Sequence, residues 1–236
     1  MNPTPLPNSA TWAVVPVKPF AQAKTRLAPA LCPHDRHRLA HAMFTHVLDT
    51  LHRSEPIAGV LVITQCPTIT LFAQQRGARV LGDPAGQPGQ CHALSTIVDA
   101  GLCHVARVHQ AQQALVLMAD LPTLGIDDVA AMLHPLHQGS VMVVAPDRHH
   151  KGTNALALRP PLGIPSCFGH DDSLVRHLMA AAAYGTPAAV VQTAGLGFDL
   201  DTPDDLCLLA STPQLLNAVG QPLADGLVPL LATSSP

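Results

Sequence analysis

Four aspartates lie close together in the segment GFDLDTPDDL, residues 197–206, of a 236-residue chain in which only 12% of residues are charged. Asp199 and Asp201 are two positions apart, so on an extended segment their carboxylates point to the same face. Neighbouring carboxylates repel each other, which raises the pKa of one of them unless a cation lies between them. A magnesium ion would remove this conflict, because Mg²⁺ binds carboxylate oxygens.

The other two aspartates of this segment have a structural explanation. Thr202, Pro203 and Asp205 match the start of a helix, with a capping threonine, a proline in the first turn and an acid at the third helical position. Asp204 adds negative charge to that first turn, where it complements the helix dipole. We therefore expect a helix to begin here, which leaves the first two aspartates for chemistry.

A further aspartate, Asp120, ends the apolar run ALVLMAD at residues 114–120. One interpretation is an ordinary turn at the end of a strand, in which a polar side chain caps the next helix. The other is a catalytic metal ligand, because open parallel sheets bind ligands beyond the carboxyl ends of their strands. In that case one or two hard cations would be held through oxygen by Asp120, Asp199 and Asp201.

All three lysines of the chain, Lys18, Lys24 and Lys151, lie just beyond apolar, strand-like segments. In KPFAQAKTRL, residues 18–27, the first two are joined by Arg26 and separated by small residues. Such a loop can wrap a nucleoside triphosphate and stabilise its pyrophosphate leaving group, although a solvated helix start is the alternative. Neither G-x-x-x-x-G-K-[ST] nor G-x-G-x-x-G occurs, so no motif indicates a P-loop or a dinucleotide fold.

The segments that must position these residues alternate between strand-like and helix-like patterns. Strands that are apolar on both faces and separated by helices predict an α/β fold, with a mostly parallel sheet covered by helices on both faces. GTNALALRP, residues 152–160, follows the preceding strand too closely for a helical crossover, so we expect an antiparallel or edge strand and a mixed sheet. The expected strands are 12–17, 60–64, 79–83, 114–120, 140–146 and 188–193, and the expected helices are 34–53, 68–77, 92–109, 125–137 and 172–184.

Length and composition favour one domain at residues 11–211, between an irregular tail at 1–10 and a leucine-bearing tail at 212–236 that would suit docking or a homodimer contact. The net charge of −3 argues against a broad nucleic-acid surface. The apolar runs are too short to cross a membrane and no leader pattern is visible, so we expect a cytoplasmic protein without a membrane partner. Six cysteines without a C-x-x-C pair predict neither zinc nor disulfides.

Five ordered motifs resemble the phospholactate guanylyltransferase family of the deazaflavin coenzyme (factor 420) pathway. They are WAVVPVKPFAQAKTRLAP, LVLMADLPTL, APDRHHKGTNALALRPP, FGHDDSLVRH and LGFDLDTPDDL, and together they span roughly residues 11–210. The resemblance implies a Rossmann-like nucleotidyltransferase fold. It also implies transfer of GMP from GTP, with magnesium, to 2-phospholactate, phosphoenolpyruvate or 3-phosphoglycerate, with release of pyrophosphate.

The resemblance further implies roles for individual residues, with Asp120, Lys18 and Lys24 as the catalytic ones. The chain departs from the family pattern at residues 89–94, where GQCHAL replaces G-L-N-x-A-L, and in the FGHDDS turn, which is one residue longer than the family spacing. The implied metal ligands are Asp120, Asp199 and Asp201, the implied triphosphate loop carries Lys18, Lys24 and Arg26, and the implied acceptor-binding positions are Thr153, Gly169 and Ser173.

Other classes of protein share some of these features. GFDLDTPDDL also fits the D-x-D-x-T motif of haloacid-dehalogenase-type phosphatases, but in those enzymes the motif ends the first strand and lysine motifs follow it, whereas here no lysine follows. The remaining alternatives are a nucleotidyltransferase of molybdopterin or sugar-phosphate type and a non-catalytic nucleotide-binding protein of the same fold. The first usually has a glycine-rich first loop, and the second would not need three intact acids.

Overall fold

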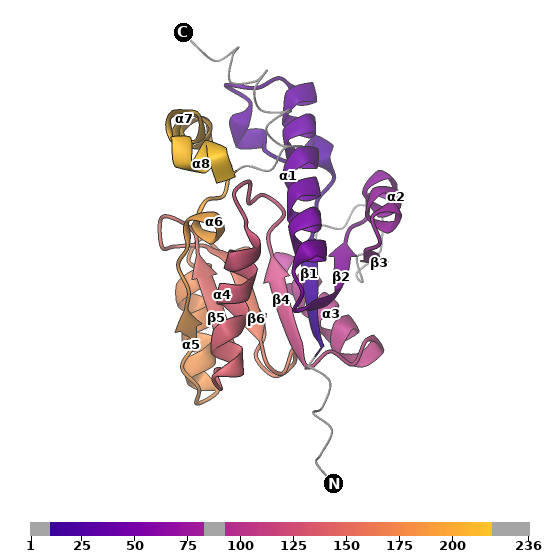
Figure 1. The fold of residues 1–236 in the computed structure, drawn as a ribbon, viewed down its shortest axis with the longest axis vertical. Helices are drawn as coiled ribbons and strands as arrows, with labels where there is room; N and C mark the ends of the chain where they lie inside the picture. The colour runs from indigo at the N-terminus through magenta and orange to yellow at the C-terminus, as the bar shows by residue number, and fades with distance from the viewer. Residues whose placement is uncertain (1–9, 83–92, 219–236) are drawn as a thin grey trace.

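The computed structural model describes residues 10–82 and 93–218, which form a mixed seven-stranded sheet with helices on both faces (Figure 1). The strand order is β3-β2-β1-β4-β6-β5-β7. All neighbouring strands are parallel except β6, which is antiparallel to both β4 and β5. The predicted mixed sheet is confirmed. The strands are β1 (Thr11–Pro16), β2 (Ile57–Ile63), β3 (Arg79–Leu81), β4 (Gln113–Leu117), β5 (Met142–Pro146), β6 (Thr153–Leu158) and β7 (Ala189–Val190).

Helices connect the strands and cover the sheet, as the periodicity of the sequence predicts. One face is covered by α1, α2 and α4, and the other by α3 and α5 (Figure 1). Two short 3-10 turns, η1 (Phe20–Gln22) and η2 (Thr25–Leu27), follow β1. The helices are α1 (Pro33–Arg53), α2 (Pro67–Gln75), α3 (Leu94–Val108), α4 (Ile126–His137), α5 (Ser173–Ala183), α6 (Ala194–Gly197), α7 (Pro203–Ser211) and α8 (Pro213–Ala218).

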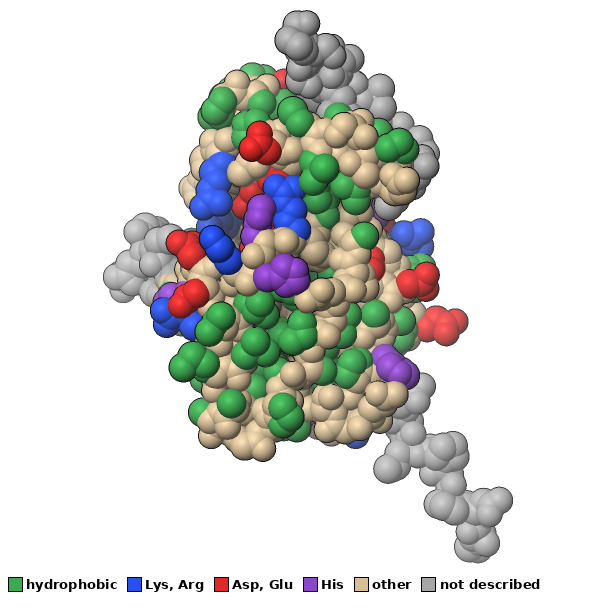
Figure 2. All heavy atoms as spheres, turned by 90° about the vertical axis from the view of Figure 1, so that its left-hand side faces the viewer, with side chains coloured by type: hydrophobic (Ala, Val, Ile, Leu, Met, Phe, Trp, Pro, Cys, Tyr) green, Lys and Arg blue, Asp and Glu red, His purple; other side chains and the backbone are tan. Residues whose placement is uncertain are grey.

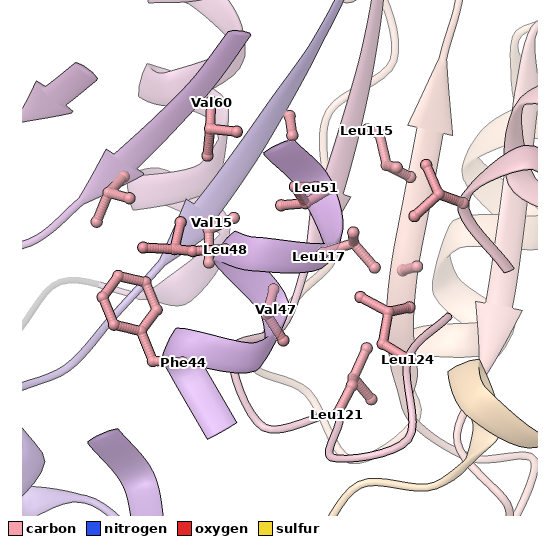
Figure 3. Packing of buried hydrophobic residues seen from close by; sticks show 14 of the residues in the cluster. Val15, Phe44, Val47, Leu48, Leu51, Val60, Leu115, Leu117, Leu121 and Leu124 are labelled. Atoms are coloured by element: carbon pink, nitrogen blue, oxygen red, sulfur yellow. The ribbon is translucent and has the colours of Figure 1, made fainter. Parts of the chain in front are cut away.

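The main core lies between α1 and the central strands. Phe44 and Leu48 of α1 are fully buried in the same cluster as Val15 of β1 and Leu117 of β4 (Figure 3). Burial of each such side chain contributes roughly 1.5–3 kcal/mol to folding. This packing fixes the central strands, and therefore the loops that follow them.

A smaller apolar cluster lies beyond the carboxyl ends of the strands. It joins Leu27, at the end of the loop after β1, to Phe198 and Leu200, which precede α7. Phe198 and Leu200 are buried, whereas Asp199 and Asp201 between and after them are only partly buried. The two acids therefore share one side of the segment, as their spacing predicts.

The expected antiparallel strand is confirmed as β6, which pairs with both β4 and β5 in the interior of the sheet. Three other local expectations need correction. Asp120 lies three residues beyond the end of β4, and Asp199 follows the short helix α6 instead of a strand. Residues 213–218 are helical rather than irregular, since Leu215 and Leu216 pack on the smaller cluster. Any contact made by the tail beyond residue 218 falls outside the described residues.

Among the helices of the described ranges, none combines the length and the apolar character that crossing a bilayer requires.

Candidate active site

Three aspartates converge beyond the carboxyl ends of the central strands. Asp120 follows β4, and Asp199 and Asp201 lie between α6 and α7. The backbone N–H of Leu200 donates to the carbonyl of Asp120 at 3.3 Å, which ties the two segments together. Burial raises the pKa of Asp199 to about 6, and the charges of Asp120 and Asp201 add to the shift. The repulsion expected from the sequence is therefore present.

The ammonium group of Lys24 lies between two of these carboxylates. Its Nζ donates to Asp120 Oδ2 at 2.7 Å and to Asp201 Oδ1 at 2.5 Å, and the side chain is only 5% exposed. Burial alone would lower the pKa of Lys24, but the two carboxylates outweigh burial and raise the pKa above its usual value. Lys24 is therefore a fixed positive charge within the acidic cluster.

The loop after β1 presents Lys24 through an uncommon backbone conformation. Lys24 lies between η1 and η2 with φ 56° and ψ 36°, in the left-handed region that non-glycine residues adopt rarely. Arg26 Nη1 is 3.9 Å from Asp201 Oδ2, and the Arg26 side chain is 71% exposed. Lys18 is also exposed, two residues after the end of β1. Of the predicted triphosphate loop, Lys24 thus contacts the acids, while Lys18 and Arg26 are open to solvent.

These residues lie where the topology of the sheet favours ligand binding. Lys24 and Asp120 follow the adjacent strands β1 and β4, and the chain continues from these strands toward opposite edges of the sheet. In open α/β sheets such a switch point is the usual ligand site. Figure 2 shows a band of basic, acidic and histidine side chains across the upper half of one face, above a mainly hydrophobic lower half.

The three carboxylates are candidate ligands for a metal ion. Within residues 10–82 and 93–218, no three histidine, cysteine, aspartate or glutamate side chains are placed to hold a metal as they stand. The cation between Asp120 and Asp201 is the Lys24 ammonium. The donor chemistry nevertheless suits Mg²⁺, because three carboxylates supply hard oxygens. In the described part of the chain, Asp120 Oδ1 is also buried without a hydrogen-bond partner.

Asn154 supports the acidic cluster, although sequence analysis did not single it out. Its Nδ2 donates to the carbonyl of Leu196 at 2.9 Å and to Asp199 Oδ1 at 3.3 Å. The side chain is buried on β6. Because these bonds join β6 to the segment after α6, Asn154 fixes the position of Asp199.

Asp205 organises the start of α7, as its helix-start pattern predicts. Its Oδ2 accepts hydrogen bonds from the backbone N–H of Asp201 at 2.9 Å and of Thr202 at 2.7 Å, and the capping box with Thr202 is complete. The same carboxylate forms an ion pair with Arg148, whose guanidinium lies 5.9 Å from the centre of the Phe198 ring. This contact connects the loop between β5 and β6 to the acidic segment.

Removal of the Asp205 side chain is expected to destabilise the protein by about 3 kcal/mol, because Arg148 and two backbone donors lose a buried partner. The measurement is the free energy of unfolding of D205A in urea. D204A is the matched control, since Asp204 is exposed in the same helical turn and should change stability by less than about 1 kcal/mol. Equal losses in the two variants would contradict the assignment.

The predicted acceptor-binding positions gather around the start of α5. Thr153 is buried at the start of β6, and Ser173 is the first residue of α5. Gly169 lies in the preceding loop with φ 90°, a conformation that favours glycine. The N–H of Leu174 donates to the carbonyl of Lys151 at 3.0 Å, which holds the beginning of α5 against the beginning of β6.

His177, one helical turn after Ser173, is fully buried among these positions and was missed by sequence analysis. Its Nδ1 is 3.1 Å from Thr153 Oγ1, and its Nε2 accepts a hydrogen bond from the N–H of Cys167 at 2.8 Å. Burial lowers the pKa of His177 to about 4, despite a hydrogen bond to the Ser173 backbone that raises it. The ring is therefore neutral near pH 7.

Acid is expected to weaken the fold through His177. The unfolded state takes up a proton as the pH falls below about 6.5, whereas the folded ring resists protonation down to about 4, so stability is complete above pH 6.5 and falls across this window. The free energy of unfolding falls by about 3 kcal/mol, because each unit of the pKa difference between the unfolded and folded states corresponds to 1.36 kcal/mol. Urea unfolding between pH 4 and 7.5 measures it, with H177Q as the non-titrating control. Identical pH slopes for the two proteins would contradict this role.

The sequence of the chain matches the model of a known protein family along almost the whole described domain. The matching family is described as "Guanylyl transferase CofC like", and residues 11–211 are matched. The chain belongs to this family of CofC-like guanylyl transferases. The family resemblance and the nucleotidyltransferase class inferred from the motifs are confirmed.

Curated relatives of this guanylyl transferase family show the same likeness over most of their length. A phosphoenolpyruvate guanylyltransferase of Sphaerobacter thermophilus is 38% identical over 200 residues, which cover 85% of this chain and 92% of the relative. A protein of the same name from Conexibacter woesei is 39% identical, with coverage of 84% of this chain and 86% of the relative.

Solved structures show the same fold at low sequence identity. A protein from Desulfovibrio desulfuricans G20, provisionally described as a nucleotide-diphospho-sugar transferase, gives a TM-score of 0.73 at 15% identity and covers 94% of this chain and 97% of its own. The structure of CMP:2-keto-3-deoxy-manno-octonic acid synthetase gives a TM-score of 0.55 at 16% identity and covers 86% of this chain and 96% of its own. The predicted Rossmann-like nucleotidyltransferase fold is confirmed.

Proposed function

We propose that the protein transfers GMP from GTP to a small phosphorylated three-carbon acid, with Mg²⁺ as cofactor and pyrophosphate as the leaving group, in the biosynthesis of the deazaflavin coenzyme. The observation that carries this proposal is the meeting of Asp120, Asp199 and Asp201 with Lys24 at the switch point of the sheet. Membership of the guanylyl transferase family and the names of its relatives support the choice of GTP.

The reaction needs no general base in the protein. An oxygen of the acceptor's phosphate is anionic at neutral pH and attacks the α-phosphorus of GTP. A new phosphorus–oxygen bond forms as the bond from the α-phosphorus to the bridging oxygen breaks, and pyrophosphate leaves with that electron pair. Catalysis then consists of in-line positioning and neutralisation of charge, which is what the converging charged side chains can supply.

Each group of predicted residues has a task in this scheme. Lys24, with Lys18 and Arg26 on the same loop, binds the triphosphate and stabilises the charge that develops on pyrophosphate. Thr153, Gly169 and Ser173 bind the acceptor. Mg²⁺, when held by Asp120, Asp199 and Asp201, supplies charge neutralisation to the phosphates.

The acceptor is assigned as one of three acids: 2-phospholactate, phosphoenolpyruvate or 3-phosphoglycerate. The curated relatives carry the name of the second, which makes phosphoenolpyruvate the first acid to test. The experiment incubates purified protein with GTP, Mg²⁺ and each acid in turn, and measures pyrophosphate release together with the mass of the GMP-linked product.

The proposal expects pyrophosphate in equal amount to a GMP–acid adduct with at least one of the three acids. Release with none of them would refute it and favour a non-catalytic nucleotide-binding protein. Release with CTP or a sugar phosphate instead would favour a different nucleotidyltransferase.

A further inference from the structure

His177 connects all three predicted acceptor-binding segments. Its ring lies 3.1 Å from the Thr153 hydroxyl on β6 and bonds to the Ser173 backbone in its own helix. Its other nitrogen accepts the N–H of Cys167, two residues before Gly169. The Phe168 ring packs against the imidazole at 5.0 Å between centroids.

The contacts of His177 determine which of its nitrogens carries the hydrogen. A backbone N–H can only donate, so Nε2, which receives the Cys167 N–H, must be unprotonated. The neutral ring therefore carries its hydrogen on Nδ1, toward the Ser173 carbonyl and the Thr153 hydroxyl. Thr153 Oγ1 can only accept from this nitrogen. Its own hydroxyl hydrogen is consequently available to another acceptor atom.

The second contact of His177 fixes the loop before α5. Cys167 N–H is held by His177, and the adjacent Ser166 N–H is held by Asp99 Oδ1 at 2.9 Å, so two consecutive amides are anchored to side chains of α5 and α3. The loop then turns at Gly169, where an added Cβ would come within 3.3 Å of Leu94 Cβ. The loop segment that carries Gly169 is thereby held close to Thr153.

We propose that His177 is a positioning residue for the phosphorylated acid. It orients the Thr153 hydroxyl as a hydrogen-bond donor toward an anionic oxygen of the acceptor. It also holds the backbone of Cys167–Gly169 in place for the same acceptor. This inference rests on the proposed function, because it concerns the acceptor half of the same site. In the variant H177L the side chain fills similar space but lacks both ring nitrogens. In H177N the side chain keeps a donor near the position of Nδ1 and loses the acceptor at Nε2.

The experiment measures steady-state kinetics of wild type, H177L, H177N, T153V and the double variant T153V/H177L, with each substrate varied at saturating levels of the other. H177L is expected to raise the KM for the acid at least roughly tenfold, the effect of losing one good hydrogen bond. The KM for GTP should stay within about twofold, and H177N should lose less than H177L. Because His177 acts through Thr153, the effects of T153V and H177L on the KM for the acid should be less than multiplicative.

The structural alternative makes different predictions. A role in folding alone would lower thermal stability without a selective change in the KM for the acid, and multiplicative effects of T153V and H177L would overturn the proposal. If H177L does not fold, H177N decides the matter, and an unchanged KM for the acid in that variant would overturn the proposal. Long-range ¹⁵N–¹H NMR of the histidine side chains tests the tautomer without any substrate, and a hydrogen on Nε2 would overturn the proposal. A wild type that uses none of the acids refutes the proposed function, whereas an active wild type with an unchanged H177L refutes this inference alone.

Discussion

The substitutions D120N and D199N are each expected to reduce the rate of guanylyl transfer by at least about 100-fold. Each change removes one of the three carboxylate charges that would hold Mg²⁺ against the phosphates. Folding should survive in both variants, since the amide has the shape of the carboxylate. D199N should be at least as stable as wild type, because burial raises the pKa of Asp199 and the charged form is therefore disfavoured in the fold. The measurements are pyrophosphate release and urea unfolding.

D204N is the matched control for these two variants. Asp204 belongs to the same acidic segment but is exposed in the first turn of α7, so its loss should leave the rate within about twofold of wild type, as for most surface changes away from a site. Full activity of D120N or D199N would refute the metal-ligand assignment. Equal losses in all three variants would point to the net charge of the segment rather than to specific ligands.

The substitution K24M is expected to change three properties: the stability of the fold, the rate of guanylyl transfer and the affinity for Mn²⁺. The metal-free protein should lose about 3 kcal/mol of stability, because Asp120 and Asp201 lose the ammonium that bridges them. Guanylyl transfer should fall by at least about 100-fold. Without nucleotide, Mn²⁺ should bind about tenfold more tightly or better, since no internal cation competes for the carboxylates. Urea unfolding, pyrophosphate release and electron paramagnetic resonance of free Mn²⁺ measure the three effects.

R107M controls for the loss of one positive charge far from the site. Arg107 is exposed near the end of α3, at the opposite end of the sheet from the acids, so R107M should bind Mn²⁺ like wild type. An unchanged or weaker Mn²⁺ affinity of K24M would show that Lys24 does not occupy the place of the metal. If K24M and R107M gained Mn²⁺ affinity equally, the gain would come from the loss of a positive charge anywhere in the protein and not from the position of Lys24.

The sequence predicted the elements that depend on local periodicity. The expected helix at 34–53 matches α1, and the expected strand at 12–17 matches β1 to within one residue. Their apolar spacing reflects burial on the sheet, which neighbouring residues specify. The interior place of β6 was not predictable in this way, because pairing with both β4 and β5 depends on the order of strands in space.

The candidate site was predictable in its charged residues but not in their partners. Asp120, Asp199 and Lys24 attract attention because charged side chains are few in this chain. The bridging position of Lys24 arises from a left-handed backbone and contacts 96 and 177 residues away along the chain, which no local pattern encodes. The structure brings all three acids together with Lys24, while Lys18 and Arg26 remain exposed.

Asn154, Arg148 and His177 were missed for the same reason. Asn154 and Arg148 lie inside the motif APDRHHKGTNALALRPP, but their partners, in residues 196–205, lie more than 40 residues away along the chain. The signal that could have drawn attention to His177 is a histidine four residues after Ser173, on a helix that is otherwise apolar except for Ser173 and Arg176. Of the departures from the family pattern, residues 89–92 fall outside the described ranges.

Calorimetric titration of GTP into the purified protein, with and without Mg²⁺, tests the central claim most directly. The claim is that Asp120, Asp199 and Asp201 serve a divalent cation that accompanies the nucleotide's phosphates. The account predicts uptake of GTP that strengthens at least about tenfold with Mg²⁺ and loses that gain in D199N. Binding of GTP that is equally strong without the metal, or no binding in either condition, would contradict it.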